Sequence, residues 1–252
     1  MTRGGLCIAL GAFAPLLAWA QAADRPTTVE LAYGRESLSN GSPDWQESTL
    51  GIGHKFAARE YLGVSLRQTR RFGLQDHSAW ATYSRPLNER LTASIEGSIS
   101  PGARFLARHT LAGALQYEFA PGWLLHGGLK AAGYEKSTVS EGSLRLERYV
   151  SDFSWSVAWK PVRGLGRYAQ SFEARGSYYY GDKSMVGLIA ATGREATSVG
   201  AQDVVLADVR SLALVGRHQL GANWALTYAL AQTRQGGFYT RTGGRLGVQY
   251  FF

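Results

Sequence analysis

The chain ends on Arg245-Leu246-Gly247-Val248-Gln249-Tyr250-Phe251-Phe252, the stretch that most restricts its fold. Successive side chains of an extended strand point to opposite sides, so this octet has two distinct faces. One face is apolar up to the last residue: Leu246, Val248, Tyr250 and Phe252. The other face carries Arg245, Gly247, Gln249 and Phe251. Soluble proteins rarely end on such a strand, although the last strand of a soluble β-sandwich is an alternative that the octet alone leaves open.

The octet resembles the carboxy-terminal signal by which outer-membrane β-barrels are recognised by the barrel-assembly machinery. The residues that carry this resemblance are Gly247, Tyr250 and Phe252. We therefore expect the chain to reside in the outer membrane of a Gram-negative bacterium, with membrane lipid and the assembly machinery as partners. We expect the octet to pair with the strand near Val29 to Tyr33, which would close a barrel and leave no free sheet edge.

The amino terminus has the composition of a secretory signal peptide. Arg3 supplies a positive charge, and the residues from Leu6 to Leu17 form an apolar core. Ala20 and Ala22 each complete a cleavage site of the small-x-small type. The apolar run contains Gly11 and Pro15 and is too short to span a bilayer as a helix.

Residues 1–22 are therefore expected to be removed, which leaves 23–252 as a single outer-membrane β-barrel domain. Removal takes Cys7, the only cysteine, and excludes a disulfide framework or a thiolate metal site. The 27 Lys and Arg residues exceed the 19 Asp and Glu residues, giving a formal net charge of +8. Because the basic residues are scattered rather than clustered, we expect no nucleic-acid partner.

The remaining sequence alternates apolar and polar residues over segments of roughly ten residues, as transmembrane β-strands do. Tight turns such as Ala120-Pro121-Gly122 separate them on one side. Longer polar connections are predicted on the other side, at 37–45, 99–107, 135–141, 161–170 and 194–203. This asymmetry is typical of the periplasmic and extracellular ends of an outer-membrane barrel. The sequence therefore predicts an all-β, transmembrane antiparallel up-and-down β-barrel with an even strand number, fourteen being favoured and twelve the alternative.

Aromatic residues favour this barrel over a soluble sandwich. Trp123 and Trp224 come directly after predicted tight turns, and Tyr178-Tyr179-Tyr180 comes directly before one. Membrane barrels place such rings at the membrane interfaces. Segments 184–193 and 204–218 are exceptional, because they are apolar on both faces; a bulge or an internal apolar contact would explain them.

The polar face of each strand is predicted to line the lumen. Opposite charges two residues apart share that face, as in Arg145 with Glu147, Glu173 with Arg175, and Asp208 with Arg210. The full set of candidate lumen charges is Arg67, Lys130, Arg145, Glu147, Glu173, Arg175, Asp208, Arg210, Arg241 and Arg245. These charges either tune the selectivity of a channel or form ion-pair ladders that stiffen its wall, and the sequence leaves both roles open.

No catalytic, cofactor-binding or metal-binding site is predicted. The five histidines are His54, His77, His109, His126 and His218. Only His77 has an adjacent serine, Ser78, and neighbours on a strand point to opposite faces. The histidines are too isolated for a metal site, and the glycines fit no phosphate-binding loop. We therefore expect neither a cofactor nor enzymatic activity.

Two segments resemble the YaiO-type outer-membrane β-barrel proteins. The first is Leu31 to Ser39 followed by Trp45-Gln46-Glu47, and the second is Tyr178 to Ser184 followed by Gly187-Leu188 and Gly193 to Ala196. The resemblance covers essentially the whole mature chain. It implies a secretion-type pore, because members of that family are linked to exopolysaccharide synthesis and export. Many members carry additional amino-terminal periplasmic repeats, whereas here the barrel pattern starts almost directly after the signal.

We therefore expect a porin-like outer-membrane pore that is a conduit for exopolysaccharide or anionic solutes. Two alternatives stay open: an outer-membrane enzyme that modifies lipid or polysaccharide, and a closed barrel with a structural or receptor role. The sequence names neither the transported substrate nor the oligomeric state.

Overall fold

The computed structural model describes residues 26–252 apart from 136, 165, 182 and 199–203. The predicted signal peptide lies outside these described residues. The strands, in chain order, are β1 (Thr27–Leu38), β2 (Trp45–Ala57), β3 (Glu60–Arg71), β4 (Leu74–Pro86), β5 (Leu91–Ile99), β6 (His109–Ala120), β7 (Trp123–Gly133), β8 (Thr138–Val150), β9 (Phe153–Gly164), β10 (Arg167–Tyr180), β11 (Ser184–Ser198), β12 (Val204–Gln219), β13 (Trp224–Gln235) and β14 (Tyr239–Phe251).

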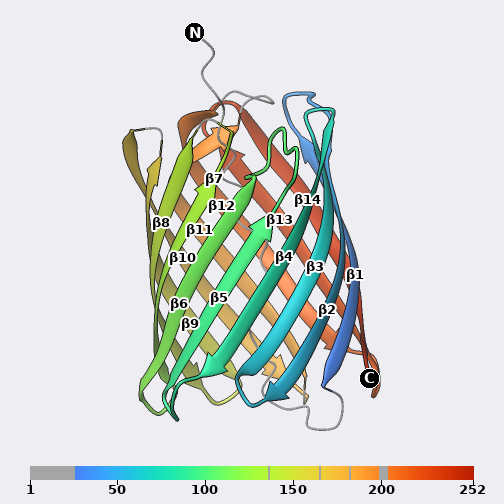
Figure 1. The fold of residues 1–252 in the computed structure, drawn as a ribbon, viewed down its shortest axis with the longest axis vertical. Coiled ribbons are helices and arrows are strands. Elements are labelled where there is room, and N and C mark those ends of the chain that lie inside the picture. The colour runs from blue at the N-terminus through green and yellow to red at the C-terminus, as the bar shows by residue number, and fades with distance from the viewer. Residues whose placement is uncertain (1–25, 136, 165, 182, 199–203) are drawn as a thin grey trace.

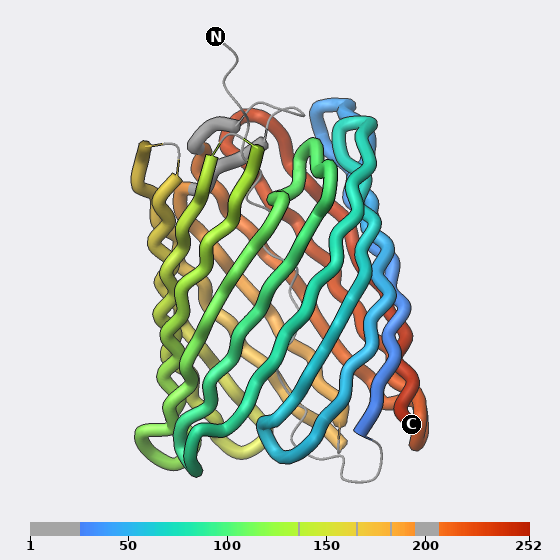
Figure 2. The backbone as a smooth tube through the Cα atoms, viewed as in Figure 1, coloured from blue at the N-terminus to red at the C-terminus, as the bar shows by residue number. Residues whose placement is uncertain are grey.

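These strands form one closed antiparallel barrel (Figure 1). Each strand pairs with its neighbours in the sequence, and β14 pairs with β1. The strands run obliquely to the barrel axis, as the closure of a sheet requires (Figure 2). The predicted all-β barrel of fourteen strands is confirmed, and the alternative of twelve strands is wrong. Within the described part of the chain, no helix is long and apolar enough to cross a membrane.

Alternation along the strands separates an apolar exterior from a polar interior. On β9, Phe153, Trp155 and Val157 are 57%, 42% and 49% exposed, whereas Ser154 and Ser156 between them are buried. This inverts the arrangement of a soluble sandwich, in which the apolar face would be covered. Large apolar side chains are also exposed on the other strands, among them Leu31, Leu66, Leu111 and Leu188, so the outer surface is apolar around the middle of the barrel.

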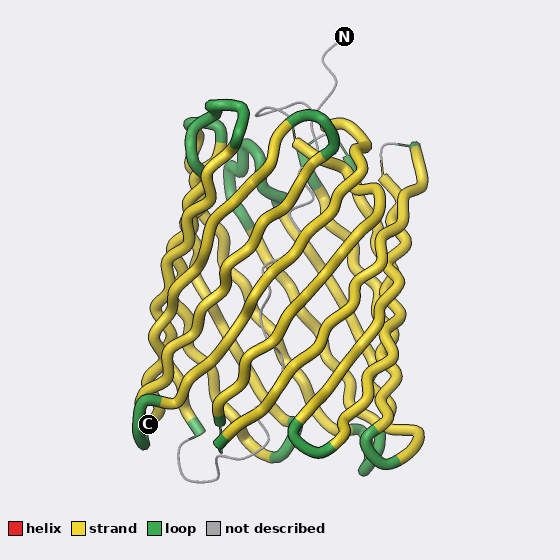
Figure 3. The backbone as a smooth tube through the Cα atoms, turned by 180° about the vertical axis from the view of Figure 1, so that it is seen from behind, coloured by secondary structure: helices red, strands yellow, loops and turns green. Residues whose placement is uncertain are grey.

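The two ends of the barrel differ in the length of their connections. Short turns at 58–59, 87–90, 121–122, 151–152, 181–183 and 220–223 lie at the end where the chain terminates (Figure 3). At the opposite end, the connections 39–44 and 100–108 are longer, and Phe72-Gly73 is a two-residue hairpin turn. Both of those turn residues have a positive φ, as this type of hairpin requires.

The predicted long connection at 161–170 is wrong, because β9 continues to Gly164 and β10 begins at Arg167. Pro161 lies within β9, where it has no N–H to donate and the pairing with β8 is interrupted. Gly142 lies opposite, and a Cβ added there would come within 3.2 Å of the proline ring. The prolines of a strand therefore need not mark its end.

The carboxy-terminal octet closes the barrel as predicted. β14 pairs with β1 from Thr28 opposite Phe251 to Leu38 opposite Arg241. The N–H of Phe252 also donates to the carbonyl oxygen of Thr27 at 2.9 Å. From Thr28 to Glu36, each residue of the first strand has a Cα partner on both β14 and β2, so no free edge is left along this part of the seam.

The doubly apolar strands β11 and β12 have an internal apolar contact. Ile189, Ala213 and Val215 are buried together on the inner side of the wall, packed against Ala229 and Ala231 of β13. The register between β11 and β12 continues without a shift from end to end. An internal contact, rather than a bulge, therefore explains their pattern, and one side of the lumen has an apolar wall.

Candidate functional site

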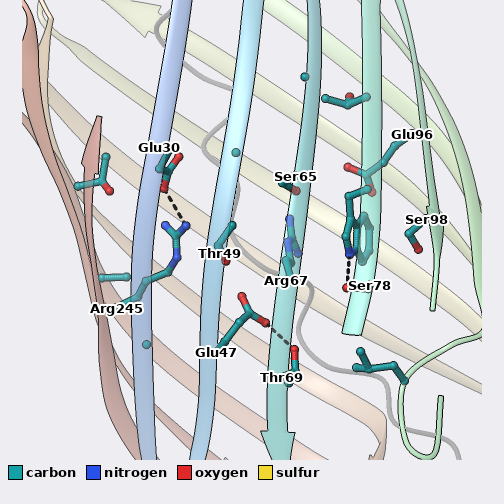
Figure 4. A pocket seen from close by; sticks show the side chains of 18 of the residues that line it. Glu30, Glu47, Thr49, Ser65, Arg67, Thr69, Ser78, Glu96, Ser98 and Arg245 are labelled. Carbon is teal, nitrogen blue, oxygen red and sulfur yellow. Dashed lines mark hydrogen bonds and ion pairs between the residues drawn. The ribbon is translucent and has the colours of Figure 1, made fainter. Parts of the chain in front are cut away.

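The candidate site is the barrel lumen, which contains a cavity of about 470 Å³. Most strands contribute to its lining. Figure 4 shows charged side chains from five of them: Glu30 on β1, Glu47 on β2, Arg67 on β3, Glu96 on β5 and Arg245 on β14. The apolar wall of β11, β12 and β13 lines another part of it through Met185, Val215, Ala229 and Ala231. A solute in this space would therefore meet charged groups on one side and aliphatic groups on another.

Two ion pairs join the first and last strands inside the lumen. Arg245 Nη2 donates to Glu30 Oε1 at 2.7 Å, and Gln249 donates to the other carboxylate oxygen at 3.2 Å. Nearer the end of the barrel that has the longer connections, Arg241 Nε lies 3.2 Å from Glu36 Oε1. These two predicted lumen arginines thus face inward and also stabilise the barrel seam.

Arg67 on β3 is a cation in the lumen with a different kind of neighbour. Its guanidinium lies over the indole ring of Trp80 on β4, 4.5 Å from the centroid. The indole N–H of Trp80 donates to Ser78 at 3.0 Å, which fixes the orientation of the ring. Among the described residues, no carboxylate lies within 4.0 Å of Arg67, and its Nε has no hydrogen-bond partner. Glu47, Glu96 and Glu30 thus act on its positive charge only from beyond ion-pair distance.

A second stacked group lies at the loop end of the lumen. Trp45 on β2 has Arg71 over its ring at 4.4 Å and Arg241 at 4.6 Å from the centroid. The indole also packs edge-on against Phe72 and Tyr239. Within the described chain, the buried indole N–H of Trp45 has no acceptor. Cation–π contacts of this kind hold guanidinium groups in a fixed position.

The predicted charges of β8 and β10 form a network across the strands rather than pairs along one strand. Glu173 accepts a hydrogen bond from Lys160 at 2.6 Å and lies 3.8 Å from Arg145. Glu147 is bonded to His126 on β7 at 2.8 Å. Arg145 and Glu173 lie on strands that do not adjoin, and both have Ala158 as their Cα partner on β9. The small alanine allows the two long side chains to meet above it.

The remaining candidate lumen charges have varied positions. Lys130 lines the cavity and is the Cα partner of Glu141. Arg175 also lines the cavity, with no carboxylate within 4.0 Å among the described residues. Asp208 and Arg210 contradict the prediction, because they lie on the outward face of β12 with the exposed Leu212.

The outward position of Asp208 and Arg210 follows from which residues of β12 face the lumen. The inward residues of β12 include Val209, Ala213 and Val215, which are buried at 2%, 3% and 8% exposure. The alternation is therefore reversed only at the start of the strand, where Asp208 and Arg210 face outward around Val209, whereas Arg217 further along lines the lumen. On the outer face, Asp208 pairs with Arg194 of β11.

The connection 100–108 is fixed to the wall by one buried carboxylate. Asp76 on β4 accepts hydrogen bonds from the backbone N–H groups of Arg104, Phe105 and Leu106 at 2.9 to 3.1 Å. β5 is short, and its pairing with β4 starts only at Ala79, so this connection lies beside the upper part of β4. Part of the connection lines the cavity at the loop end.

Trp45, Trp80 and Arg71 are lumen residues that the sequence alone did not single out. All three fall on the inward parity of β2, β3 or β4, so a strict count along each strand would have found them. Trp45 was overlooked because aromatic residues at strand ends also occur at membrane interfaces. Trp80 lies in the middle of β4, a strand whose two faces differ little in polarity.

The three residues of the predicted assembly signal lie at the short-turn end of the seam. Tyr250 packs edge-on against Trp224 and Phe252, which forms an aromatic group on the outer surface. Gly247 faces inward, and a Cβ added to it would lie 2.5 Å from Thr227 Oγ1. Gly247 therefore has a packing role in addition to any part in recognition.

The described histidines do not form a hydrolase-like arrangement. His54, His77, His126 and His218 contact Thr27, Gln75, Glu147 and Tyr180, respectively, and the described residues include no hydrogen bond from histidine to serine. Among the same residues, no three Asp, Glu, His or Cys side chains are grouped so that they could hold a metal ion.

Solved structures with the same fold include outer-membrane channels and other outer-membrane proteins. The CymD monoaromatic hydrocarbon channel matches with a TM-score of 0.63 and 10% identity, over 90% of this chain and 89% of that chain. A bacterial polysaccharide outer membrane secretin matches with a TM-score of 0.58 and 7% identity, over 91% and 99%. Omp33 of Acinetobacter baumannii matches with a TM-score of 0.57 and 11% identity, over 92% and 100%. At these identities, the likeness concerns the fold.

A search of the curated proteins found no significantly similar relative. The model of one protein family, described as the YaiO membrane beta barrel domain, matches residues 26–198, which is more than half of the chain. Both this match and the porin-like fold place the protein in the outer membrane of Gram-negative bacteria, in a lipid environment. Because outer-membrane barrels have short periplasmic turns and longer extracellular loops, we assign the end with the longer connections to the extracellular side and the other end to the periplasm. The chain belongs to the YaiO family of membrane β-barrels.

Proposed function

We propose that the barrel is a passive conduit that prefers anionic solutes, and that an acidic exopolysaccharide is the polymer that suits its lumen. The observation that carries this proposal is the charge of the cavity lining. Apart from the outward-facing Arg35, the lining includes seven Arg and Lys side chains and five Glu side chains, an excess of two positive charges. An excess of one sign in a confined, partly desolvated space attracts the opposite sign.

The positions of the cations strengthen this preference. Glu30 and Glu36 are neutralised by Arg245 and Arg241. Arg67 and Arg71 instead stack on tryptophan rings, with no carboxylate within 4.0 Å among the described residues. A guanidinium held by an indole keeps its N–H groups available for a passing carboxylate or phosphate.

The apolar wall supports a carbohydrate as the solute. Sugar rings have apolar faces, and an acidic sugar also carries a carboxylate. Val215 and Ala229 on one side, with Arg67 on another, would meet both features of one residue of such a polymer. The secretin-like fold is consistent with this choice, and family membership agrees with a role in exopolysaccharide export.

Planar-bilayer recording tests the conduit. The folded protein should give a voltage-independent conductance, with a reversal potential under a KCl gradient that indicates anion preference. Arg67→Glu lowers the lining charge by two and should move that potential towards neutrality or cation preference. Arg163→Glu is the matched control, because Arg163 lies on the outer surface over Tyr168 and should leave selectivity unchanged. Folded protein that passes no current at any voltage would overturn the proposal in favour of a closed structural or receptor barrel.

A second measurement tests the solute. An oligouronate of six residues should interrupt the current at lower concentration than a neutral maltohexaose, and Arg67→Gln with Arg71→Gln should abolish this difference. Equal block by the two sugars would keep the conduit and reject the acidic polysaccharide. Release of sugar or fatty acid during either experiment would revive the enzyme alternative.

A further inference from the structure

Four charged side chains gather on the outer surface near the extracellular ends of β11, β12 and β13. They are Arg194, Asp208, Arg210 and Arg234, which we call the outer arginine cluster. Arg210 and Arg234 are direct Cα partners across the pair of β12 and β13. Arg194 and Asp208 are direct partners across β11 and β12, with Nε 3.2 Å from Oδ1.

These side chains point away from the lumen. Val209 lies between Asp208 and Arg210 and is 2% exposed, on the inner side of the wall. Leu212, two residues from Arg210 and on its face, is 59% exposed. Because successive side chains of a strand alternate, Asp208 and Arg210 share the outward face of Leu212.

The cluster begins where the apolar outer surface ends. On the outward face of β12, Leu212 is the residue next to Arg210. On the outward face of β13, Gln232 lies between Arg234 and Leu230. Leu230 is 58% exposed and belongs to the same apolar surface. Thr192, the Cα partner of Arg210 on β11, completes the polar row. The arginines therefore lie at the level of the lipid headgroups of the outer leaflet.

The charges of the cluster do not balance. Asp208 neutralises Arg194, and Arg234 makes only a 3.4 Å contact to the carbonyl oxygen of Gly236. Among the described residues, no carboxylate lies within 4.0 Å of Arg210 or Arg234. Like charges placed directly opposite each other across two strands destabilise the pair. An anion between the two guanidinium groups would remove this repulsion.

We propose that the outer arginine cluster binds the phosphorylated headgroup of an outer-leaflet glycolipid, a lipid A. A phosphate monoester carries about −1.5 to −2 charges at neutral pH, which matches the two unneutralised arginines. The planar guanidinium group binds phosphate through two parallel hydrogen bonds. The acyl chains of the same molecule would lie along Leu212 and Leu230, directly next to the arginines.

The outer arginine cluster adjoins the apolar outer surface, and this arrangement favours a lipid over free phosphate as the ligand. A soluble anion would use only Arg210 and Arg234, at positions fully open to water and salt. A glycolipid uses the arginines together with the apolar surface, so its phosphate is held at the cluster by the bilayer itself. The inference concerns the outer surface and does not depend on conduction through the lumen.

The test uses the full-length protein, purified in detergent micelles, with bisphosphorylated lipid A as the probe. Native mass spectrometry and a fluorescence titration measure the bound lipid and its affinity. Arg210→Ala combined with Arg234→Ala should weaken binding about tenfold or more, the loss expected for two charge-assisted contacts. Arg210→Lys with Arg234→Lys, which keeps the charge without the planar fork, should give an intermediate affinity.

The matched control is Arg35→Ala. Arg35 also lies on the outer surface near the extracellular end, but Asp44 neutralises it through a 2.6 Å hydrogen bond. This variant should bind lipid A as the unmodified protein does. Because the clustered arginines are exposed, the double variant should also keep the thermal transition of the unmodified protein, which shows that it is folded.

Three outcomes would overturn the inference. The first is equal affinity of the double variant and the unmodified protein for bisphosphorylated lipid A. The second is equal affinity of the unmodified protein for lipid A from which both phosphates have been removed. The third is complete displacement of the lipid by excess inorganic phosphate, which would identify a site for a free anion.

Discussion

Arg245 of β14 donates to Glu30 of β1 at 2.7 Å, so an ion pair inside the lumen joins the last strand to the first. Residues 215 positions apart in the chain are thereby held together at the only place where the barrel closes on itself. The two side chains are 33% and 25% exposed, so the pair is partly screened by water.

Replacing Glu30→Ala should weaken this seam. The change leaves Arg245 without its carboxylate and removes the acceptor of Gln249. We expect a loss of about 1–3 kcal/mol in the free energy of unfolding, the range for hydrogen bonds to charged groups. Urea unfolding in lipid vesicles, followed by tryptophan fluorescence, measures this loss. Glu60→Ala is the control, since Glu60 bonds only Tyr83 near a periplasmic turn and should cost less.

Replacing Asp76→Ala should loosen the connection 100–108 without unfolding the barrel. Asp76 is the acceptor for three successive backbone N–H groups of that connection. Its loss leaves the connection without its attachment to β4, because β5 is too short to hold it there. Amide hydrogen exchange should accelerate at 104–106 and stay unchanged in β9 and β10. An unchanged exchange rate at 104–106 would contradict the assignment of Asp76 as the anchor.

Replacing Glu173→Gln should increase the preference for anions. Glu173 neutralises Lys160 and Arg145, and the amide keeps the shape of the side chain while removing its charge. A unit charge about 8 Å from the ion path contributes about 0.5 kcal/mol in water. Removing the charge lowers the energy of an anion and raises that of a cation by this amount, so the ratio of anion to cation permeability should rise roughly fivefold. A fall in this ratio in planar bilayers would exclude an open lumen at this wall.

Replacing Gly247→Ala should destabilise the seam by overpacking. The added Cβ would lie 2.5 Å from Thr227 Oγ1 and 3.0 Å from the Cβ of Ala32. Overpacking in a closely packed wall costs about 1–3 kcal/mol. Refolding into detergent, without any assembly machinery, should show the loss. Adding Thr227→Ala should recover part of it, whereas no recovery would indicate a role for Gly247 other than packing.

Replacing Phe252→Ala tests the assembly signal separately. Phe252 packs edge-on against Tyr250 on the outer surface, where removing the ring leaves no buried cavity. Refolding into detergent should therefore be nearly unchanged, while the amount of folded barrel in outer membranes of expressing cells should fall. A loss of similar size in both measurements would assign Phe252 a structural role alone.

The sequence predicted the strands well because alternation in a barrel is a local property. A residue such as Arg67 or Glu173 is placed in the lumen simply by counting along its own strand. The same reasoning placed the last strand against the first, because a closed barrel leaves an end strand no other partner.

Asp208 and Arg210 show where counting fails. Their strand is apolar on both faces, so polarity cannot tell the inner face from the outer one. The inward side is decided by the packing of Val215 with Ile189 and Ala213, a contact between strands that no single segment contains. Trp45 was missed for a related reason, because an aromatic residue near a strand end suits both the membrane interface and the lumen.

The small side chain of Ala158 affects the charged residues on both neighbouring strands. It lies between Arg145 and Glu173 on the adjoining strands, and its small size leaves the space in which those side chains meet. A leucine at this position would fill that space and would keep Arg145 and Glu173 apart. The electrical character of this part of the wall is therefore encoded at a position that has no charge of its own.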